Sequence, residues 1–184
     1  QDVVTFVLAN LPSAPARVLE VGAGRGDLAR LLTGAGYDVV GRGGQSLAAK
    51  WSDGVASFHG MHVHDFPNCF ILSNAQSGFT PSYPHMLNEQ ARHVAYLIET
   101  ARNRGLETIE ASEQAEKEWV DTILGLAGRM NDFLSNCTPG YYNNEGRPDE
   151  RSAQNGFYGG GPVEFIALWE SWRADGRLAG LELH

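Results

Sequence analysis

The stretch that decides the fold is VLEVGAGRGDLARLLTGAGYDVVGRGGQSLAAKW, residues 18–51. Residues 17–21 form a short apolar run typical of a buried parallel strand, and residues 27–33 continue as a helix. Glycines end this helix, and residues 37–40 resemble a second strand. The segment therefore predicts a βαβ unit with a glycine-rich turn after its first strand.

Downstream of this unit the sequence predicts one further buried strand and three helices, the first of which follows that strand. CFILSN at residues 69–74 is typical of a buried strand, and SFHGMHVH at residues 57–64 of an extended segment. A helix is expected from about Met86 to Arg104, with Gly105 after its end. Its predicted apolar face consists of Leu87, Ala91, Val94, Ile98 and Ala101.

The last third of the chain predicts two more helices and a terminal strand. Ser112 is expected to cap the first of them. Residues 136–161 form a long irregular stretch, and a final helix ends at Gly176 before a strand in LAGLEL. Together these elements predict an α/β fold, with a partial Rossmann-like sheet, flanking helices and a long irregular C-terminal region.

Composition argues against several kinds of partner. Apolar residues make up 42% of the 184 residues, and the net charge is -8 with no dense basic run, so a nucleic-acid partner is not expected. No apolar run has membrane-spanning length and the first residues lack a secretory pattern, so no membrane partner is expected. Cys69 and Cys137 lack metal-ligand spacing, which indicates a reduced, cytoplasmic setting. The chain begins with Gln1 rather than methionine, which suggests a fragment.

The glycine turn EVGAGRG is a candidate ligand site. Gly22, Gly24 and Gly26 let the backbone turn sharply and approach a ligand, while the following helix presents free N–H groups. Such a turn suits a nucleotide or an adenosyl group. The alternative is that the three glycines serve only the packing of strand against helix.

VLEVGAGRGDLARLL resembles the first motif of class I S-adenosylmethionine-dependent methyltransferases. The resemblance covers residues 1–40 and implies that Glu20 and the glycine turn hold the methionine end of that cofactor. In such folds an acidic residue after the second strand bonds the ribose, but here Arg42, Gly43 and Gly44 follow it. Despite this missing acidic residue, the resemblance predicts that residues 1–40 form a methyltransferase-like βαβ nucleotide-binding segment.

The remaining chain is similar to the C-terminal segment of Baeyer–Villiger monooxygenases, which use FAD and NADPH to insert oxygen beside a ketone carbonyl. The likeness rests on FPNCFILSNAQSGFTPSYPHMLNEQARHVAYLI, AEKEWVD, CTPGYYNNEGRP and FYGGGPVEFIALWESWRADGRLAGLEL. It covers about residues 36–184, so residues 41–184 are predicted to be a second segment joined to the first. The protein resembles a hybrid joined at GYDVV, which suits both families.

This resemblance implies a flavin-contacting turn. AQSGFT would lie against the isoalloxazine ring, and the helix that begins near His85 or Met86 would direct its positive end at the flavin. The residues expected to contact the cofactor are Gln76, Ser77, Gly78, Phe79, Thr80 and Met86. The resemblance also implies NADP as second cofactor and a small-molecule ketone as substrate.

Several parts of such an enzyme are missing from the sequence. We find no second glycine fingerprint for NADPH, no FxGxxxHxxxW signature, and no region holding the family's catalytic arginine. The catalytic residues are therefore unknown, and oxygenation by this chain alone is not expected. Self-association or a complementing chain would supply the rest. The alternatives are a methyltransferase-like protein that binds S-adenosylmethionine, and a non-catalytic nucleotide-binding or interaction module.

Histidines are concentrated in HGMHVHD. His59, His62, His64 and Asp65 lie within seven residues, and on an extended segment His62 and His64 would share one face. No fourth ligand is evident, so no metal site is expected. We expect the separate pair His85 and His93, eight residues apart on a helix, to be a capping residue and a surface residue.

Overall fold

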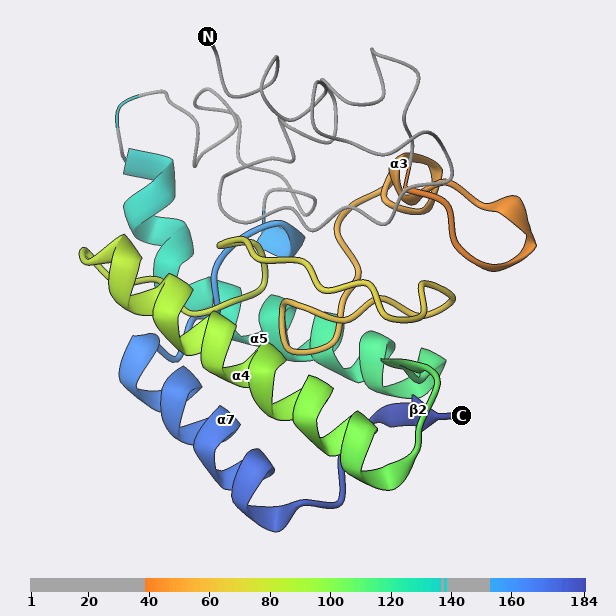
Figure 1. Cartoon of the computed structure of the whole chain (residues 1–184). Helices are drawn as coiled ribbons and strands as arrows, with labels where there is room; N and C mark the ends of the chain where they lie inside the picture. The colour runs from red at the N-terminus through yellow and green to blue at the C-terminus, as the bar shows by residue number, and fades with distance from the viewer. Residues whose placement is uncertain (1–38, 137, 139–152) are drawn as a thin grey trace, which may run out of the picture.

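The computed structural model describes residues 39–136, 138 and 153–184. Its elements are η1 (Arg42–Gly44), α3 (Leu47–Lys50), α4 (Tyr83–Arg104), β1 (Ile109–Ala111), α5 (Glu113–Asn136), α7 (Pro162–Asp175) and β2 (Leu181–Leu183). Helices α4 and α7 pack side by side, with α5 behind them in the view of Figure 1. In the described part of the chain, no helix is both long enough and apolar enough to cross a bilayer.

The start of α5 and the ends of α4 and α7 coincide with the capping residues that the sequence predicts. The Ser112 hydroxyl accepts a hydrogen bond from the backbone N–H of Ala115 at 3.2 Å, as expected of an N-cap. Helices α4 and α7 end at Gly105 (φ 68°) and Gly176 (φ 69°), in the left-handed conformation that favours glycine. The predicted helix boundaries at Ser112, Gly105 and Gly176 are thus confirmed, whereas α4 begins at Tyr83, three residues before the expected start, and the helix predicted at residues 27–33 lies outside the described residues.

The predicted buried face of α4 was correct only in part: Val94 and Ala101 pack against the core, whereas Ala91 and Ile98 are exposed. The residues that α4 buries are Met86, Glu89, Gln90, His93 and Leu97. Ile98, expected on the apolar face, is 48% exposed. Gln90 and His93 have partners inside the protein, so the face that α4 turns inward carries polar side chains that a hydrophobicity pattern assigns to the surface.

The sheet differs from the expected one. Strands β1 and β2 pair antiparallel, with Ile109 opposite Leu183 and Ala111 opposite Leu181. The terminal strand is confirmed, whereas residues 69–74 form no regular strand and residues 57–64 form a turn, closed by an antiparallel bridge between Phe58 and His62. A strand is stabilised by hydrogen bonds to a neighbouring strand, and the sheet of the described residues pairs β1 only with β2, not with residues 69–74. Among them the predicted Rossmann-like sheet has no counterpart, and residues 17–38 of the βαβ unit lie outside the described part.

The core lies between α4, α5 and α7. The largest cluster of buried apolar side chains consists of Phe58, Met61, Met86, Ala111, Ala115, Trp119, Ile123, Tyr158, Phe165 and Trp169. Aromatic rings dominate it: the Trp119 ring stacks on Tyr158 with centroids 5.6 Å apart, and Trp169 meets Phe165 at 4.6 Å. This aromatic core fixes the loop of residues 57–80 against the three helices.

The turn at residues 59–61 depends on a glycine. Gly60 has φ 69°, and a Cβ built there would lie 2.7 Å from the carbonyl oxygen of Gln76. We expect Gly60→Ala to lower the free energy of unfolding by about 2–4 kcal/mol, combining left-handed strain with overpacking. Gly105→Ala is the matched control, because its φ is 68° and open space surrounds it. Urea unfolding of both variants measures the difference, and equal losses would contradict the close packing at Gly60.

Candidate functional site

The turn predicted to contact a flavin is centred on Gln76, which is fully buried. Its side-chain oxygen accepts from the Ser57 hydroxyl at 2.7 Å, and its Nε2 donates to the carbonyls of Val55 (2.7 Å) and Gln154 (3.0 Å). Its own carbonyl accepts from the indole N–H of Trp119 at 3.1 Å. Gln76 thus joins three segments that are far apart in the sequence and holds the turn rigidly.

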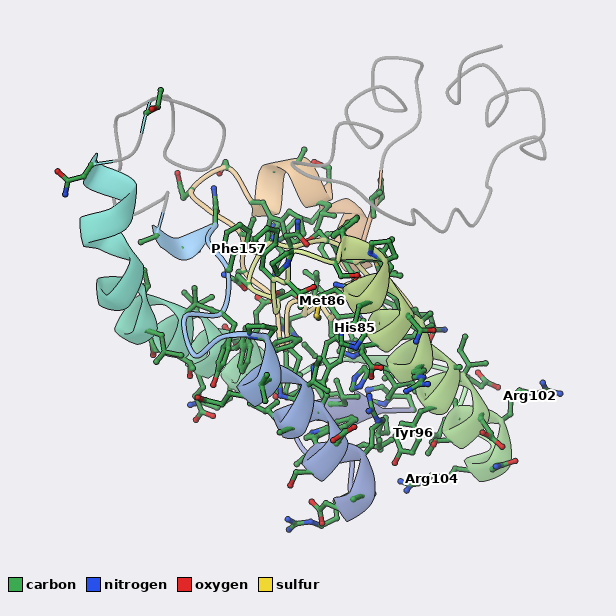
Figure 2. The ribbon with its side chains drawn as sticks, turned by 90° about the vertical axis from the view of Figure 1, so that its left-hand side faces the viewer. His85, Met86, Tyr96, Arg102, Arg104 and Phe157 are labelled. Carbon is green, nitrogen blue, oxygen red and sulfur yellow. The ribbon has the colours of Figure 1, made fainter. Side chains whose placement is uncertain are left out.

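Ser77, Gly78 and Met86 lie in the same buried layer. The Ser77 hydroxyl accepts from Gln90 Nε2 at 3.3 Å. A Cβ on Gly78 would lie 2.7 Å from the Phe165 ring and 3.1 Å from the Met86 methyl group. Figure 2 shows Met86 pointing into the interior of the molecule, and its side chain is fully buried. Gly78 is therefore needed for close packing of the turn on α7, whatever else the turn contacts.

The end of the turn leads directly into α4. Phe79 stacks on Phe157 with ring centroids 4.4 Å apart, and the Thr80 hydroxyl donates to the Ser82 carbonyl at 2.8 Å. Ser82 precedes α4 but forms no side-chain cap, and Pro84 occupies the first turn. His85, near the start of α4, is exposed. The first turn of α4 therefore presents its positive end toward the surface next to Phe79.

These contacts restrict how the turn can meet a flavin. The side-chain polar atoms of Gln76, Ser77 and Thr80 already bond within the protein. Asn74 Oδ1 is buried without a hydrogen-bond partner among the described residues, which leaves an acceptor for an outside donor. The exposed residues at the start of α4, including His85, are free to approach a ligand. Since Gln76, Ser77 and Thr80 are buried, a flavin would meet this segment through the partly exposed Phe79 and the exposed start of α4, and contact with the cofactor remains a prediction.

The other predicted ligand site is not described. Glu20, Gly22, Gly24 and Gly26 all lie in residues 1–38, outside the described residues. Binding of S-adenosylmethionine by residues 20–26 therefore stays a prediction from sequence.

The structure brings three histidines together in the core, which the sequence analysis missed. His59, His62 and His93 are each at most 5% exposed. The ring centroid of His93 lies 6.4 Å from that of His59 and 6.0 Å from that of His62. The expectation of a surface His93 was wrong: its ring stacks on Trp169 at 4.4 Å. The residues next to His93 in the sequence form no pattern that would separate this buried histidine from the exposed His85.

Burial keeps these imidazoles neutral. Desolvation lowers the pKa of His59 to about 3, aided by nearby His62, and lowers that of His62 to about 3. Burial, the two other rings and Arg173 lower the pKa of His93 to about 2. A protonated ring would have no anionic partner among the described residues, so the three imidazoles are neutral at neutral pH.

His62 and His64 do not share a face, contrary to the expectation for an extended segment. His62 packs against Phe70 with ring centroids 5.5 Å apart, inside the core. His64 instead turns toward β1, where its Nδ1 lies 3.0 Å from the carbonyl oxygen of Ala111. The turn at residues 59–61 breaks the alternation that a strand would impose.

No protein-family model matches the sequence, whereas comparison with individual proteins gives clear relatives. Pentalenolactone D synthase of Streptomyces arenae is 54% identical over 149 residues, covering 81% of this chain and 25% of that protein. A Baeyer-Villiger monooxygenase of Stachybotrys chlorohalonatus is 38% identical over 146 residues (79% and 23%). An FAD-binding monooxygenase of Hypomyces subiculosus is 37% identical over 147 residues (80% and 24%).

Solved structures agree with these relatives. The polycyclic ketone monooxygenase of Thermothelomyces thermophila superposes with a TM-score of 0.75 at 31% identity, covering 85% of this chain and 25% of that one. Cyclohexanone monooxygenase of Rhodococcus sp. Phi1, bound to NADP+, gives 0.67 at 22% identity (86% and 28%), which shows the fold alone. About four-fifths of this chain is therefore homologous to a segment of Baeyer–Villiger monooxygenases, and the chain spans about a quarter of their length.

Proposed function

We propose that this chain is part of a flavin-dependent monooxygenase of the Baeyer–Villiger type, which inserts oxygen beside the carbonyl of a ketone. The observation that carries the proposal is the 54% identity to pentalenolactone D synthase over 81% of the chain. The polycyclic ketone monooxygenase among the structural neighbours supports a ketone substrate. Because the chain spans a quarter of these proteins, we infer that the remaining parts of the site come from sequence beyond it or from a complementing chain.

In this proposal FAD, reduced by NADPH, supplies the oxidative chemistry, and residues 76–86 position the flavin. The hydrogen bonds of Gln76 hold the turn in one conformation, so little entropy is lost when a cofactor docks on it. The start of α4 offers backbone N–H groups and a positive dipole end to the negatively charged part of the ring system. Phe79, stacked on Phe157, excludes water from that side.

S-adenosylmethionine binding by residues 20–26 is the second candidate, favoured by the glycine turn EVGAGRG. It predicts a separate ligand response of the purified chain. In a thermal unfolding assay, a ligand at a hundred times its dissociation constant stabilises by about 2.7 kcal/mol, or roughly 5–10 °C for a chain of this size. A shift with S-adenosylmethionine but none with FAD would favour this candidate over the monooxygenase.

A segment exchange tests the monooxygenase directly. Residues 39–184 replace the matching segment of Streptomyces arenae pentalenolactone D synthase, and oxygenated product is measured with NADPH and the substrate of that enzyme. We expect the chimera to form product and this chain alone to form none. The matched control carries the enzyme's own segment reinserted at the same junctions. A chimera that retains FAD but forms no product, beside an active control, would contradict the proposal.

A further inference from the structure

A pocket on the far side of the β1–β2 pair from the core has no role in the proposed function. It is open, has a volume of about 530 Å³, and is lined by Arg42, Asp65, Glu107, Glu110, Glu182 and His184, together with Thr108. Four carboxylates and one guanidinium line it, so at neutral pH its charge is negative. Residues from four separate parts of the chain meet here because β1 pairs with β2 and the Asp65 carbonyl accepts from the Arg42 backbone N–H at 2.7 Å.

Glu110 is the unusual member of this pocket. It is 2% exposed, and its Oε1 accepts from Arg42 Nε at 2.9 Å and from Arg42 Nη2 at 2.5 Å. Its other oxygen, Oε2, is buried and has no hydrogen-bond partner among the described residues. A buried carboxylate oxygen without a donor is costly, so a native structure normally pairs it with a proton donor or a cation.

His64 does not line the pocket but lies beside two of the residues that do, Asp65 and Glu110. Its backbone N–H donates to Glu116 Oε2 at 2.7 Å, which fixes its position. Its Nδ1 lies 3.0 Å from the Ala111 carbonyl, which can only accept, so Nδ1 carries the proton and Nε2 keeps its lone pair. Metal-binding histidines commonly donate their other N–H to a backbone carbonyl in this way. His64 Nε2 lies 3.8 Å from Asp65 Oδ2.

The ligand atoms of these side chains converge. One atom each of His64, Asp65 and Glu110 lie within 4.8 Å of one another, as do atoms of Glu110, Glu182 and His184. Ligand atoms bound to one zinc ion each lie about 2.1 Å from the metal, and therefore up to roughly 4 Å from one another. Small side-chain rotations would bring the ligand atoms of either set to these distances. Asp65, Glu182 and His184 are partly exposed and can make such rotations.

We propose that this pocket binds one divalent transition-metal ion, with Glu110 Oε2 as the central ligand and His64 and Asp65 beside it. Imidazole with carboxylates suits Zn²⁺ and its neighbours better than Ca²⁺ or Mg²⁺, which prefer oxygen ligands alone. The positive charge of Arg42 repels a cation, but Arg42 donates to Glu110 Oε1 and leaves Glu110 Oε2 without a partner among the described residues. The site replaces our expectation of no metal, and it does not rest on the proposed enzymatic function.

Titration of the metal-free 184-residue chain with Zn²⁺, monitored by isothermal titration calorimetry, tests this proposal. We expect one Zn²⁺ per chain, and binding about 10- to 100-fold weaker for Glu110→Gln and for His64→Gln. Glu107→Gln is the matched control, because it removes the same charge from the pocket wall without touching the ligand set. Arg42→Gln should strengthen binding, a gain that misfolding cannot imitate.

Three results would overturn the site. The first is the absence of stoichiometric Zn²⁺ binding by the unsubstituted chain. The second is equal affinity for Glu110→Gln, His64→Gln and the Glu107→Gln control, in variants whose far-ultraviolet circular dichroism matches the parent. The third is binding of Mg²⁺ or Ca²⁺ at least as tight as that of Zn²⁺, which would show that the imidazole takes no part.

Discussion

Acidification from pH 7 to pH 5 is expected to lower the free energy of unfolding by about 6 kcal/mol, because three buried histidines must stay neutral in the folded state. Their pKa values are lowered to about 3, 3 and 2 in His59, His62 and His93. In the unfolded chain histidine titrates near 6.5, so below that pH the unfolded state binds more protons and stability falls as the pH falls. The loss approaches about 4 kcal/mol per pH unit for the three rings together.

In the described part of the chain, no group near the rings offsets the cost of protonating them. The charged group that meets the cluster is Arg173 of α7, whose Nη1 lies 3.4 Å from His93 Nδ1, and its positive charge opposes protonation further. One nitrogen each of His59 and His93, and both of His62, lack hydrogen-bond partners among the described residues. Since small domains have a total stability of about 5–15 kcal/mol, the protein should be close to unfolding at pH 5.

Urea unfolding followed by tryptophan fluorescence at pH 7, 6 and 5 measures this dependence. His93→Phe should reduce the pH slope by about a third while retaining a ring against Trp169. His85→Gln removes an exposed histidine from the same helix and should leave the slope unchanged. A stability that stays constant between pH 7 and pH 5 would show that water or an anion reaches the cluster.

Among the described residues, the ends of the long helices were predictable from sequence, and the orientation of α4 was not. Ser112, Gly105 and Gly176 mark helix ends by local chemistry, which acts over a few residues and can be read from sequence. The inward face of α4 depends on partners far along the chain. Gln90 bonds the Ser73 carbonyl at 2.8 Å, and His93 stacks on α7. Hydrophobicity alone assigns both residues to solvent.

The terminal strand β2 was predicted from the sequence, whereas strand β1, its pairing with β2 and the acidic pocket beside them were not, for a related reason. Strand β1 has three residues, too few for an alternating pattern, and its partner β2 lies about seventy residues away. The pocket combines Arg42, Glu110 and His184, whose proximity depends on that pairing. By contrast, the candidate flavin turn at residues 76–80 was identified through resemblance to a family, since its side chains carry no local signature of cofactor binding.

Trp169→Ala is expected to lower the free energy of unfolding by about 3–5 kcal/mol, the usual cost of emptying a tryptophan-sized site in a core. The Trp169 ring is 1% exposed and lies between His93 at 4.4 Å and Phe165 at 4.6 Å. Its indole N–H has no partner among the described residues, so the loss comes from packing and not from a broken hydrogen bond. Urea unfolding at pH 7 measures the change.

Val163→Ala on the same helix is the matched control, because Val163 is 82% exposed and its truncation should change stability by less than about 0.5 kcal/mol. The Trp169 variant also affects the histidine cluster, since the cavity beside His93 admits water and lets that ring accept a proton more readily. We therefore expect Trp169→Ala to have a shallower pH dependence than the parent chain. A loss below about 1 kcal/mol, with an unchanged pH slope, would show that α7 does not close the core over His93.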